Sequence, residues 1–128
     1  MDWFRRISLC LLAVGVGCSK VSPGRGEAGP ENPGPGAALG QKIFLSRCFV
    51  CHGTNGNGQG PAATGLGANP RDFTDPAWQR SATDDRIRKV IRKGGEAVGE
   101  NAAMPPNPDL QNDQVEGLLA FIRSLARS

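Results

Sequence analysis

The segment Cys48–His52 constrains this chain more than any other part of its sequence. It reads CFVCH, so two thiols stand three residues apart and an imidazole follows the second thiol directly. Proteins use such a spacing in three ways: to bind a metal ion, to form a redox disulfide, or to attach a haem. Only the residues elsewhere in the chain can decide between these uses.

Residues 1–17 are typical of a signal peptide. A pair of arginines precedes an apolar run over residues 7–16, which is too short to span a bilayer. Small residues then lead to Cys18, and this order is similar to the processing site of a bacterial lipoprotein. We expect lipid at Cys18, because an exported chain would otherwise carry an odd exposed thiol. Cleavage after Gly17 without lipid is the alternative. The chain is therefore expected on the periplasmic side, anchored to a membrane.

Residues 18–38 are rich in Pro, Gly, Ala and Glu and show no apolar period. Such a composition cannot bury enough apolar surface to fold, so it predicts a disordered tether. The folded domain is then expected over residues 39–128. The formal net charge of +3 is too small to indicate a nucleic-acid partner.

Apolar residues recur at helical spacing in three segments, and these segments predict the fold. The first ends at Cys48, the second runs from candidate caps at Ser81 and Thr83 to a stop at Gly94–Gly95, and the third begins after residue 112 or 113. No segment alternates apolar and polar residues long enough for a strand, so the fold is predicted to be all-α. The apolar positions are Leu39, Ile43 and Phe44, then Ile87, Val90 and Ile91, then Val115, Leu118, Leu119, Ile122 and Leu125.

Gly40 stands inside the first predicted helix, where glycine costs about 0.5–1 kcal/mol relative to alanine. One interpretation is that another backbone comes close at this point. The other is a first turn that frays. A core this small also needs a staple or a cofactor to be stable.

The two thiols and the imidazole do not complete a zinc site. A structural zinc ion takes four Cys or His ligands, and after export only the distant Cys18 could join Cys48, Cys51 and His52. A thioredoxin-like disulfide would follow a strand and open a helix. Here a predicted helix precedes the two cysteines and a glycine-rich loop follows them.

Covalent haem fits where zinc and a disulfide fail. Thiols three residues apart can each add to one vinyl group of the same porphyrin, and the next residue can turn its imidazole onto the iron. We therefore predict one c-type haem, bound through Cys48 and Cys51, with His52 as an axial iron ligand.

Met104 is the expected second axial ligand. His52 is the only histidine of the chain, so a second imidazole is excluded within a monomer. Apart from Met1, Met104 is the only methionine, and the two prolines that follow it restrict the loop. The alternative is that the methionine only fills a gap in the core.

Over about two thirds of its length, the chain resembles a class I cytochrome c of the small bacterial type. Gly40 and Phe44 before the CxxCH motif resemble the first helix of that family, and Leu118 with Phe121 resembles its last helix. The resemblance implies a small cytochrome c fold, with helices packed around one covalently bound haem. It also implies that the first and last helices cross at Gly40.

The resemblance extends to residues that support the haem. Pro61 is similar to the proline whose carbonyl accepts the second N–H of the axial histidine, which would fix the histidine tautomer. The segments 70–74 and 104–105 also resemble the family. The sequence contains no tyrosine. We therefore expect the haem propionates to bind Trp78, Arg71 or backbone groups.

With both axial positions filled, the predicted protein is a one-electron carrier rather than an enzyme. We expect it to serve a respiratory chain and to meet a redox partner such as an oxidase, a reductase or a quinol-oxidising complex. Two alternatives stay open. One is a gas-binding or peroxidatic haem protein in which Met104 is labile or absent from the iron, and the other is a cytochrome subunit of a larger oxidoreductase complex.

The second predicted helix carries a basic run that we expect to contribute to docking on an acidic redox partner. Such a run is also typical of a plain solvated helix face, which is the alternative. The residues of this run are Arg86, Arg88, Lys89, Arg92 and Lys93.

Overall fold

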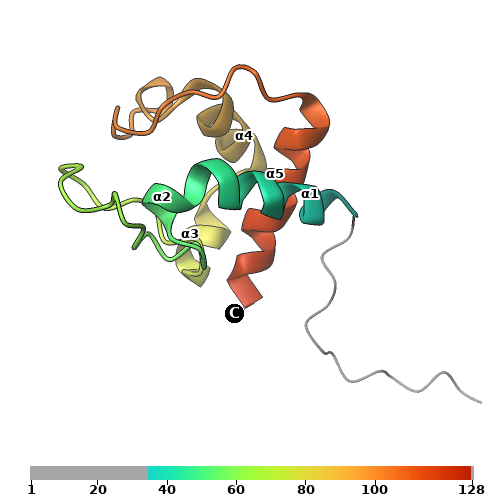
Figure 1. Cartoon of the computed structure of the whole chain (residues 1–128), viewed down its shortest axis with the longest axis horizontal. Coiled ribbons are helices and arrows are strands. Elements are labelled where there is room, and N and C mark those ends of the chain that lie inside the picture. The colour runs from blue at the N-terminus through green and yellow to red at the C-terminus, as the bar shows by residue number, and fades with distance from the viewer. Residues whose placement is uncertain (1–34, 128) are drawn as a thin grey trace, which may run out of the picture. The chain divides into compact units, whose positions relative to one another are not determined.

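The computed structural model describes residues 35–127, which form helices joined by loops (Figure 1). The described part contains no strand, so the all-α prediction is confirmed. None of its helices is long and apolar enough to cross a membrane. The predicted signal peptide and Cys18 lie outside the described residues. The elements are α1 (Pro35–Ile43), a π-helical turn (Phe44–Cys48), α2 (Phe49–His52), α3 (Pro76–Ser81), α4 (Asp84–Lys93), a 3-10 turn (Glu96–Val98), α5 (Asn112–Ser124) and a second 3-10 turn (Leu125–Arg127).

Helix α1 begins earlier than the sequence pattern indicates. It starts at Pro35, and Ala37 is buried against the rest of the domain, so the last residues of the predicted tether are helical. Proline suits the first turn of a helix because its missing N–H has no helical partner there. The apolar period missed these residues because alanine and glycine carry no large side chain. The domain therefore begins before the predicted boundary at residue 39.

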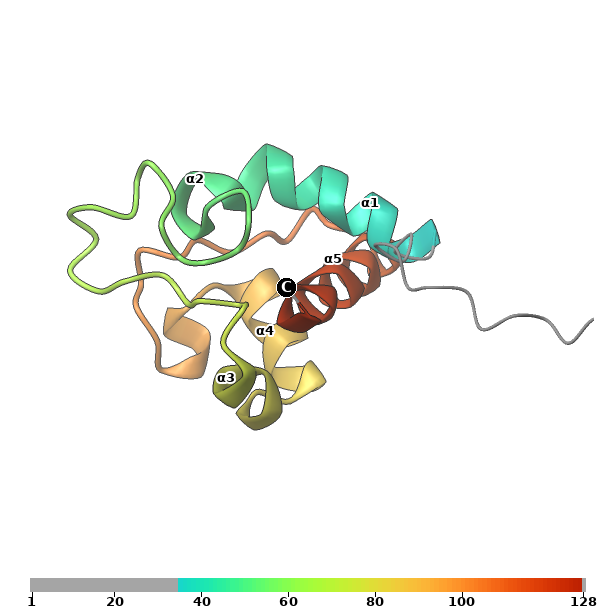
Figure 2. The same cartoon turned by 90° about the horizontal axis from the view of Figure 1, so that it is seen from below.

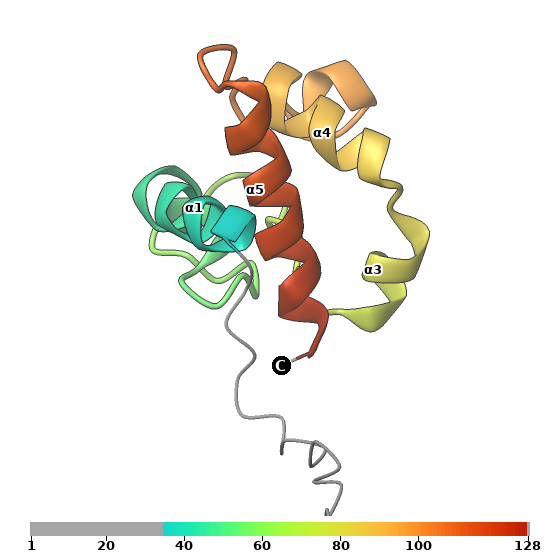
Figure 3. The same ribbon diagram turned by 90° about the vertical axis from the view of Figure 1, so that its right-hand side faces the viewer.

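The first and last helices cross with their backbones in close contact (Figures 2 and 3). A Cβ atom on Gly40 would overlap the carbonyl group of Gly117 and lie 2.6 Å from the amide nitrogen of Leu118. A Cβ atom on Gly117 would lie 2.5 Å from the carbonyl oxygen of Gly36. The close-approach interpretation of Gly40 is thus confirmed, and the fraying alternative is wrong. The sequence pattern did not identify Gly117 as its partner.

The core next to this crossing consists of aromatic and aliphatic side chains. Phe44 is fully buried, with its ring centroid 5.1 Å from that of Phe121 and 6.1 Å from that of Phe73. The apolar positions predicted for the last helical segment are all buried, on α5 and in the 3-10 turn that follows it, and on α4 the side chains of Ile87 and Ile91 are buried as well. These contacts fix α1, α4 and α5 around a common centre.

Helix α4 begins and ends at the predicted signals. The Thr83 hydroxyl accepts a hydrogen bond from the backbone N–H of Arg86, and Gly94 ends the helix with a φ of 81°. Ser81 does not cap α4, because it is the last residue of α3. The short α3 was not predicted, although Asp75 caps it and Pro76 opens it, which is a standard start signal.

Candidate functional site

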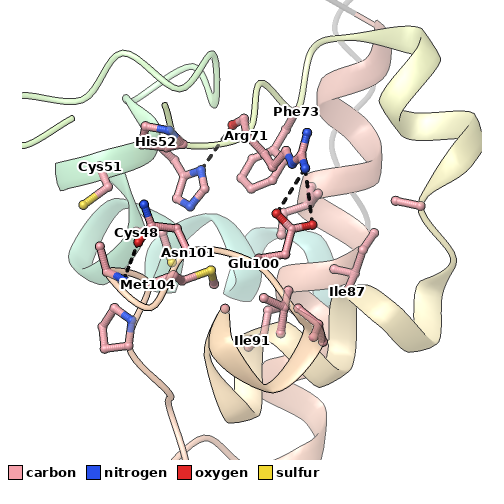
Figure 4. Close-up of a pocket in the computed structure, with 18 of the residues that line it drawn as sticks. Cys48, Cys51, His52, Arg71, Phe73, Ile87, Ile91, Glu100, Asn101 and Met104 are labelled. Atoms are coloured by element: carbon pink, nitrogen blue, oxygen red, sulfur yellow. Dashed lines mark hydrogen bonds and ion pairs between the residues drawn. The ribbon is translucent and has the colours of Figure 1, made fainter. Parts of the chain in front are cut away.

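A cavity of about 400 Å³ lies within the described domain (Figure 4). The π-helical turn, helices α2 to α5 and the loops after α2 and α4 contribute to its walls. Most of its helical lining is apolar, with Phe44, Ile87, Ile91 and Leu118 among the lining residues. Of the residues predicted to form the site, it brings together Cys48, Cys51, His52, Arg71, Trp78 and Met104.

The glycine-rich loop after the CxxCH motif closes the end of α2. The N–H of Gly58 donates to the carbonyl of His52 at 2.8 Å, and the N–H of Gly60 donates to the carbonyl of Cys51 at 3.0 Å. The N–H of Ala62 likewise donates to the carbonyl of Val50 at 2.8 Å. These carbonyls would otherwise lack partners at the helix end. The loop therefore holds the motif rigid from outside the cavity.

A π-helical turn, Phe44–Cys48, lies directly before the motif. Such a turn holds an extra residue and changes the direction in which the following side chains point. The hydroxyl of Ser46 donates to the carbonyl of Ile43 at 2.9 Å, which satisfies one group of the widened turn. Cys48 ends this turn and Cys51 lies on α2, which follows it directly. Both side chains nevertheless line the same cavity.

His52 is buried and held by two neighbours. Its ring stacks on Phe73, with centroids 4.5 Å apart and planes inclined by 19°. Its Nδ1 lies 3.2 Å from the carbonyl oxygen of Arg71, and because a carbonyl only accepts, Nδ1 carries the proton. Burial lowers the pKa of His52 more strongly than this hydrogen bond raises it, so the neutral ring is favoured. Its Nε2 lone pair is then available to a metal.

The prediction that the Pro61 carbonyl accepts a hydrogen bond from His52 is wrong. Pro61 is exposed and does not line the cavity, and the carbonyl in contact with the ring belongs to Arg71. The glycine-rich loop turns back over α2, which places Pro61 at the surface. The chain reaches the imidazole ring of His52 only at Arg71, next to Pro70, whose carbonyl a Cβ atom on Gly58 would overlap.

Cys48 and Cys51 are free thiols, both half-buried. Burial, the largest cause, raises the pKa of Cys48 to about 11, so this group is a neutral thiol near pH 7 rather than a thiolate. Within residues 35–127 no group of three His, Cys, Asp or Glu side chains is arranged to hold a metal ion. The pair lies beside His52 without the further ligands that a structural zinc site takes.

Met104 enters the same cavity from the loop after α4, and its sulfur and the His52 ring both point inward in Figure 4. The carbonyl of Met104 accepts from the N–H of Gly95 at 3.0 Å, and its own N–H donates to the carbonyl of Asn101 at 3.2 Å. A Cβ atom on Gly94 would lie only 2.8 Å from the Met104 carbonyl oxygen. The glycine pair that ends α4 therefore also receives the Met104 loop.

An ion cluster at the cavity wall was not foreseen from the sequence. The Glu100 carboxylate lies 2.8 Å from the Arg86 guanidinium and 3.1 Å from that of Arg71, and all three residues line the cavity. The hydrogen bond from Arg86, together with that from Arg71, holds the pKa of Glu100 below its usual value. Trp78 also lines the cavity, where its ring packs 5.1 Å from that of Phe73.

The arginines of the predicted basic run on α4 are bound within the domain. Arg86 pairs with Glu100, Arg88 pairs with Glu116 at 2.8 Å, and Arg92 donates to the carbonyl of Leu110 at 3.1 Å. Lys89 and Lys93 are exposed and form no ion pair with any residue of the described part. Three of the five basic side chains predicted for docking thus bind α4 to neighbouring segments of the domain.

The donors at the cavity fit a haem. Two thiols three residues apart suit two vinyl groups, and an imidazole with a free Nε2 follows them. The thioether of Met104 is a further donor group that lines the same cavity, and the apolar lining suits a porphyrin ring.

Comparisons with known proteins agree with this chemistry. Residues 37–126 match the family model described as Cytochrome c. A solved structure described as "KustC0563 c-type cytochrome" is 32% identical to this chain, with a TM-score of 0.54, and the match covers 67% of this chain and 95% of that one. Members of the family carry covalently attached haem c, so the predicted cofactor is confirmed. The chain belongs to the cytochrome c family, and its general role is electron transfer by haem.

Proposed function

We propose that the protein is a periplasmic one-electron carrier of a respiratory chain, with haem attached to Cys48 and Cys51 and with His52 and Met104 as axial ligands. The observation that carries this proposal is the entry of an imidazole and a thioether into one cavity beside the two thiols. When bound there, haem c supplies a one-electron change between ferric and ferrous iron.

The chain's own residues set the conditions for that change. The Arg71 carbonyl holds the proton on Nδ1 of His52 and leaves Nε2 free. The thioether of Met104 is a weak donor that favours ferrous iron, so we expect a higher potential than two imidazoles would give. Apolar side chains such as Ile87 and Ile91 line the cavity and offer water no hydrogen-bond partner.

The axial positions separate a carrier from a gas-binding or peroxidatic protein. With His52 and Met104 on the iron no position is left for a substrate, and the chain has no second histidine to assist peroxide cleavage. Electrons would then leave near Cys48 and Cys51, beside the exposed Val50. We therefore propose exchange with redox proteins, either as a free carrier or within a larger oxidoreductase complex.

The substitution Met104→Ala tests the proposal. It should leave haem on the chain, open one coordination position to carbon monoxide and lower the reduction potential. Met104→His is the matched control, because a second imidazole should again exclude carbon monoxide. Visible spectra of the ferrous proteins with and without the gas measure this. If the ferrous wild type already binds carbon monoxide readily, Met104 is not a firm ligand and the gas-binding alternative replaces the carrier.

The covalent attachment has its own test. Extraction of the holoprotein with acidic acetone should leave the red colour on the polypeptide, because thioether bonds to Cys48 and Cys51 survive acid. Loss of colour to the solvent would contradict the attachment.

We also propose that the mature protein is anchored at Cys18 on the periplasmic side of a membrane. The support is the sequence alone: the signal-like residues 1–17 and the small residues before the cysteine. Mass spectrometry of the mature N-terminus should find a diacylglyceryl group on Cys18. An unmodified N-terminus at this position would remove the anchor.

A further inference from the structure

Two segments that border the cavity carry no charged side chain. No Asp, Glu, Lys or Arg occurs from Phe49 to Pro70, and none occurs from Asn101 to Pro108. The single histidine within them, His52, is buried. Elsewhere charges are frequent, above all on α4. We call residues 49–70 and 101–108 together the uncharged rim.

The two segments of the uncharged rim form one connected surface. The side-chain amide of Asn101 donates to the carbonyl of Leu66 at 2.8 Å, and this bond joins one segment to the other. Leu66 and Ala68 of the first segment and Ala103 of the second line the same cavity. In Figures 1 and 2 the two loops extend toward the same end of the domain. The rim is therefore the border of the cavity on this side.

The exposed side chains of the uncharged rim are all uncharged, and those other than Thr54, Asn55, Gln59, Thr64, Asn69 and Asn101 are small or apolar. Val50 is 40% exposed and lies between the two cysteines. Exposed alanines and prolines continue this surface on both segments: Pro61, Ala62, Ala102, Ala103, Pro105 and Pro106.

Most charges next to the uncharged rim are paired within the domain. Arg47 pairs with Asp109 at 2.7 Å, and Arg71 shares the Glu100 carboxylate with Arg86. Such pairs leave little net field to attract a charged protein. A charged partner face would lose hydration on the uncharged rim without meeting a counter-charge, which is unfavourable.

We infer that the uncharged rim is the face on which the protein exchanges electrons, and that its partner is a redox protein with an uncharged, apolar contact face. This inference rests on the proposed function, because it takes haem to be attached to Cys51, which lies within the rim, and to Cys48, which directly precedes it. In the encounter one electron passes from the ferrous haem to the oxidised centre of the partner, and no bond or proton is transferred.

The experiment compares two blue-copper proteins as oxidants of the ferrous holoprotein, one with an uncharged apolar face beside its copper and one with an acidic face. Rates are measured by stopped flow between about 0.01 M and about 1 M salt, where the Debye length falls from roughly 30 Å to roughly 3 Å. The apolar probe should react faster at every salt concentration, and its rate should change less than about twofold. A faster reaction with the acidic probe at low salt that falls steeply with added salt would overturn the inference.

Matched variants place the same charge on and off the uncharged rim. Ala62→Glu and Ala102→Glu add a carboxylate at exposed rim positions, and Ala120→Glu adds one at an exposed position of α5. Each rim variant should slow the apolar probe about tenfold, because the carboxylate loses hydration in the encounter. The Ala120→Glu variant should react as the wild type does. Equal rates in all three variants would also overturn the inference, whereas carbon monoxide binding by the wild type would contradict the proposed function itself.

Discussion

The crossing of α1 with α5 and the Met104 loop support the two sides of the site by different means. At the crossing, Gly40 and Gly117 bring two backbones together, and large buried side chains such as Phe44 and Leu118 surround the contact. The Met104 loop buries no large side chain, and its prolines and alanines are exposed. Backbone hydrogen bonds to Gly95 and Asn101 hold it in place.

This difference indicates unequal local stability. Regions with few buried apolar contacts and many exposed hydrogen bonds open at lower free energy than the core. His52 lies at the end of the helical stretch that leads from the crossing and is packed on Phe73, so it should keep its place when Met104 leaves. Damage at the crossing should unfold the whole domain, and damage at the loop should release only the sulfur.

The largest effect is expected from Gly40→Ala, because the new methyl group would meet the backbone of Gly117, which cannot turn aside. We expect a loss of about 3 kcal/mol in the free energy of unfolding, measured by denaturant titration of the holoprotein. Gly36→Ala is the control on the same helix, since its methyl group would meet nothing within 4 Å. The control should be neutral or slightly stabilising. Equal losses in both variants would contradict the tight crossing.

A smaller and local effect is expected from Gly95→Ala. Its methyl group would overlap the carbonyl of Asn101 and displace the Met104 loop. The ferrous variant should bind carbon monoxide, while the free energy of unfolding should fall by about 1 kcal/mol. Gly99→Ala is the control. Its φ of 74° should make alanine cost about 1 kcal/mol of unfolding free energy, but its methyl group would meet no atom within 4 Å and so should not displace the loop. Carbon monoxide binding by the control alone would reverse this assignment.

The ion cluster at Glu100 should make the stability of the loop depend on pH. Its arginine partners lower the pKa of Glu100 in the folded protein, so the cluster stabilises the fold above the unfolded value of about 4.3. That contribution is lost as pH falls through the lower, folded pKa. Glu100→Gln should therefore cost about 1 kcal/mol at neutral pH and almost nothing near pH 3. A difference between wild type and variant that grows on acidification would contradict this sign.

The smallest effect is expected from substitutions on α4 that lie outside both the α1–α5 crossing and the Met104 loop. Replacement of Lys89 and Lys93 by glutamate should change the rate of electron transfer to the apolar copper protein by less than about twofold at low salt. Both side chains are exposed, so the fold should tolerate the change. A large salt-dependent loss of rate would instead restore the basic docking face predicted from the sequence.

The helices could be predicted because their information is local. Buried positions such as Val115 and Ile122 repeat at the helical period, and Thr83 and Gly94 mark the ends of α4 by their own chemistry. The short α3 was not predicted because its sequence has no apolar residues at helical spacing. The Asp75–Pro76 start was its one available signal.

The contacts within the site were harder to predict, because they join loops through backbone groups. The carbonyl of Arg71, rather than that of Pro61, reaches His52, and no side-chain type reports which carbonyl will do so. Glu100 joins Arg71 to Arg86 only after three segments have folded together. The motif and Met104 could be proposed as haem ligands from the sequence because few residue types offer a thiol, an imidazole or a thioether, and all of them line one cavity.

The hydrogen bond from His52 to residue 71 has a consequence for how such a protein can vary by mutation. Its acceptor is a main-chain carbonyl, which every amino acid supplies, so no single codon change at this position deletes the acceptor. The ligand that we propose opposite His52 is a side chain, and almost any codon change at Met104 removes its sulfur. Heritable variation in reduction potential should therefore accumulate on the methionine side, while the histidine side stays constant across lineages.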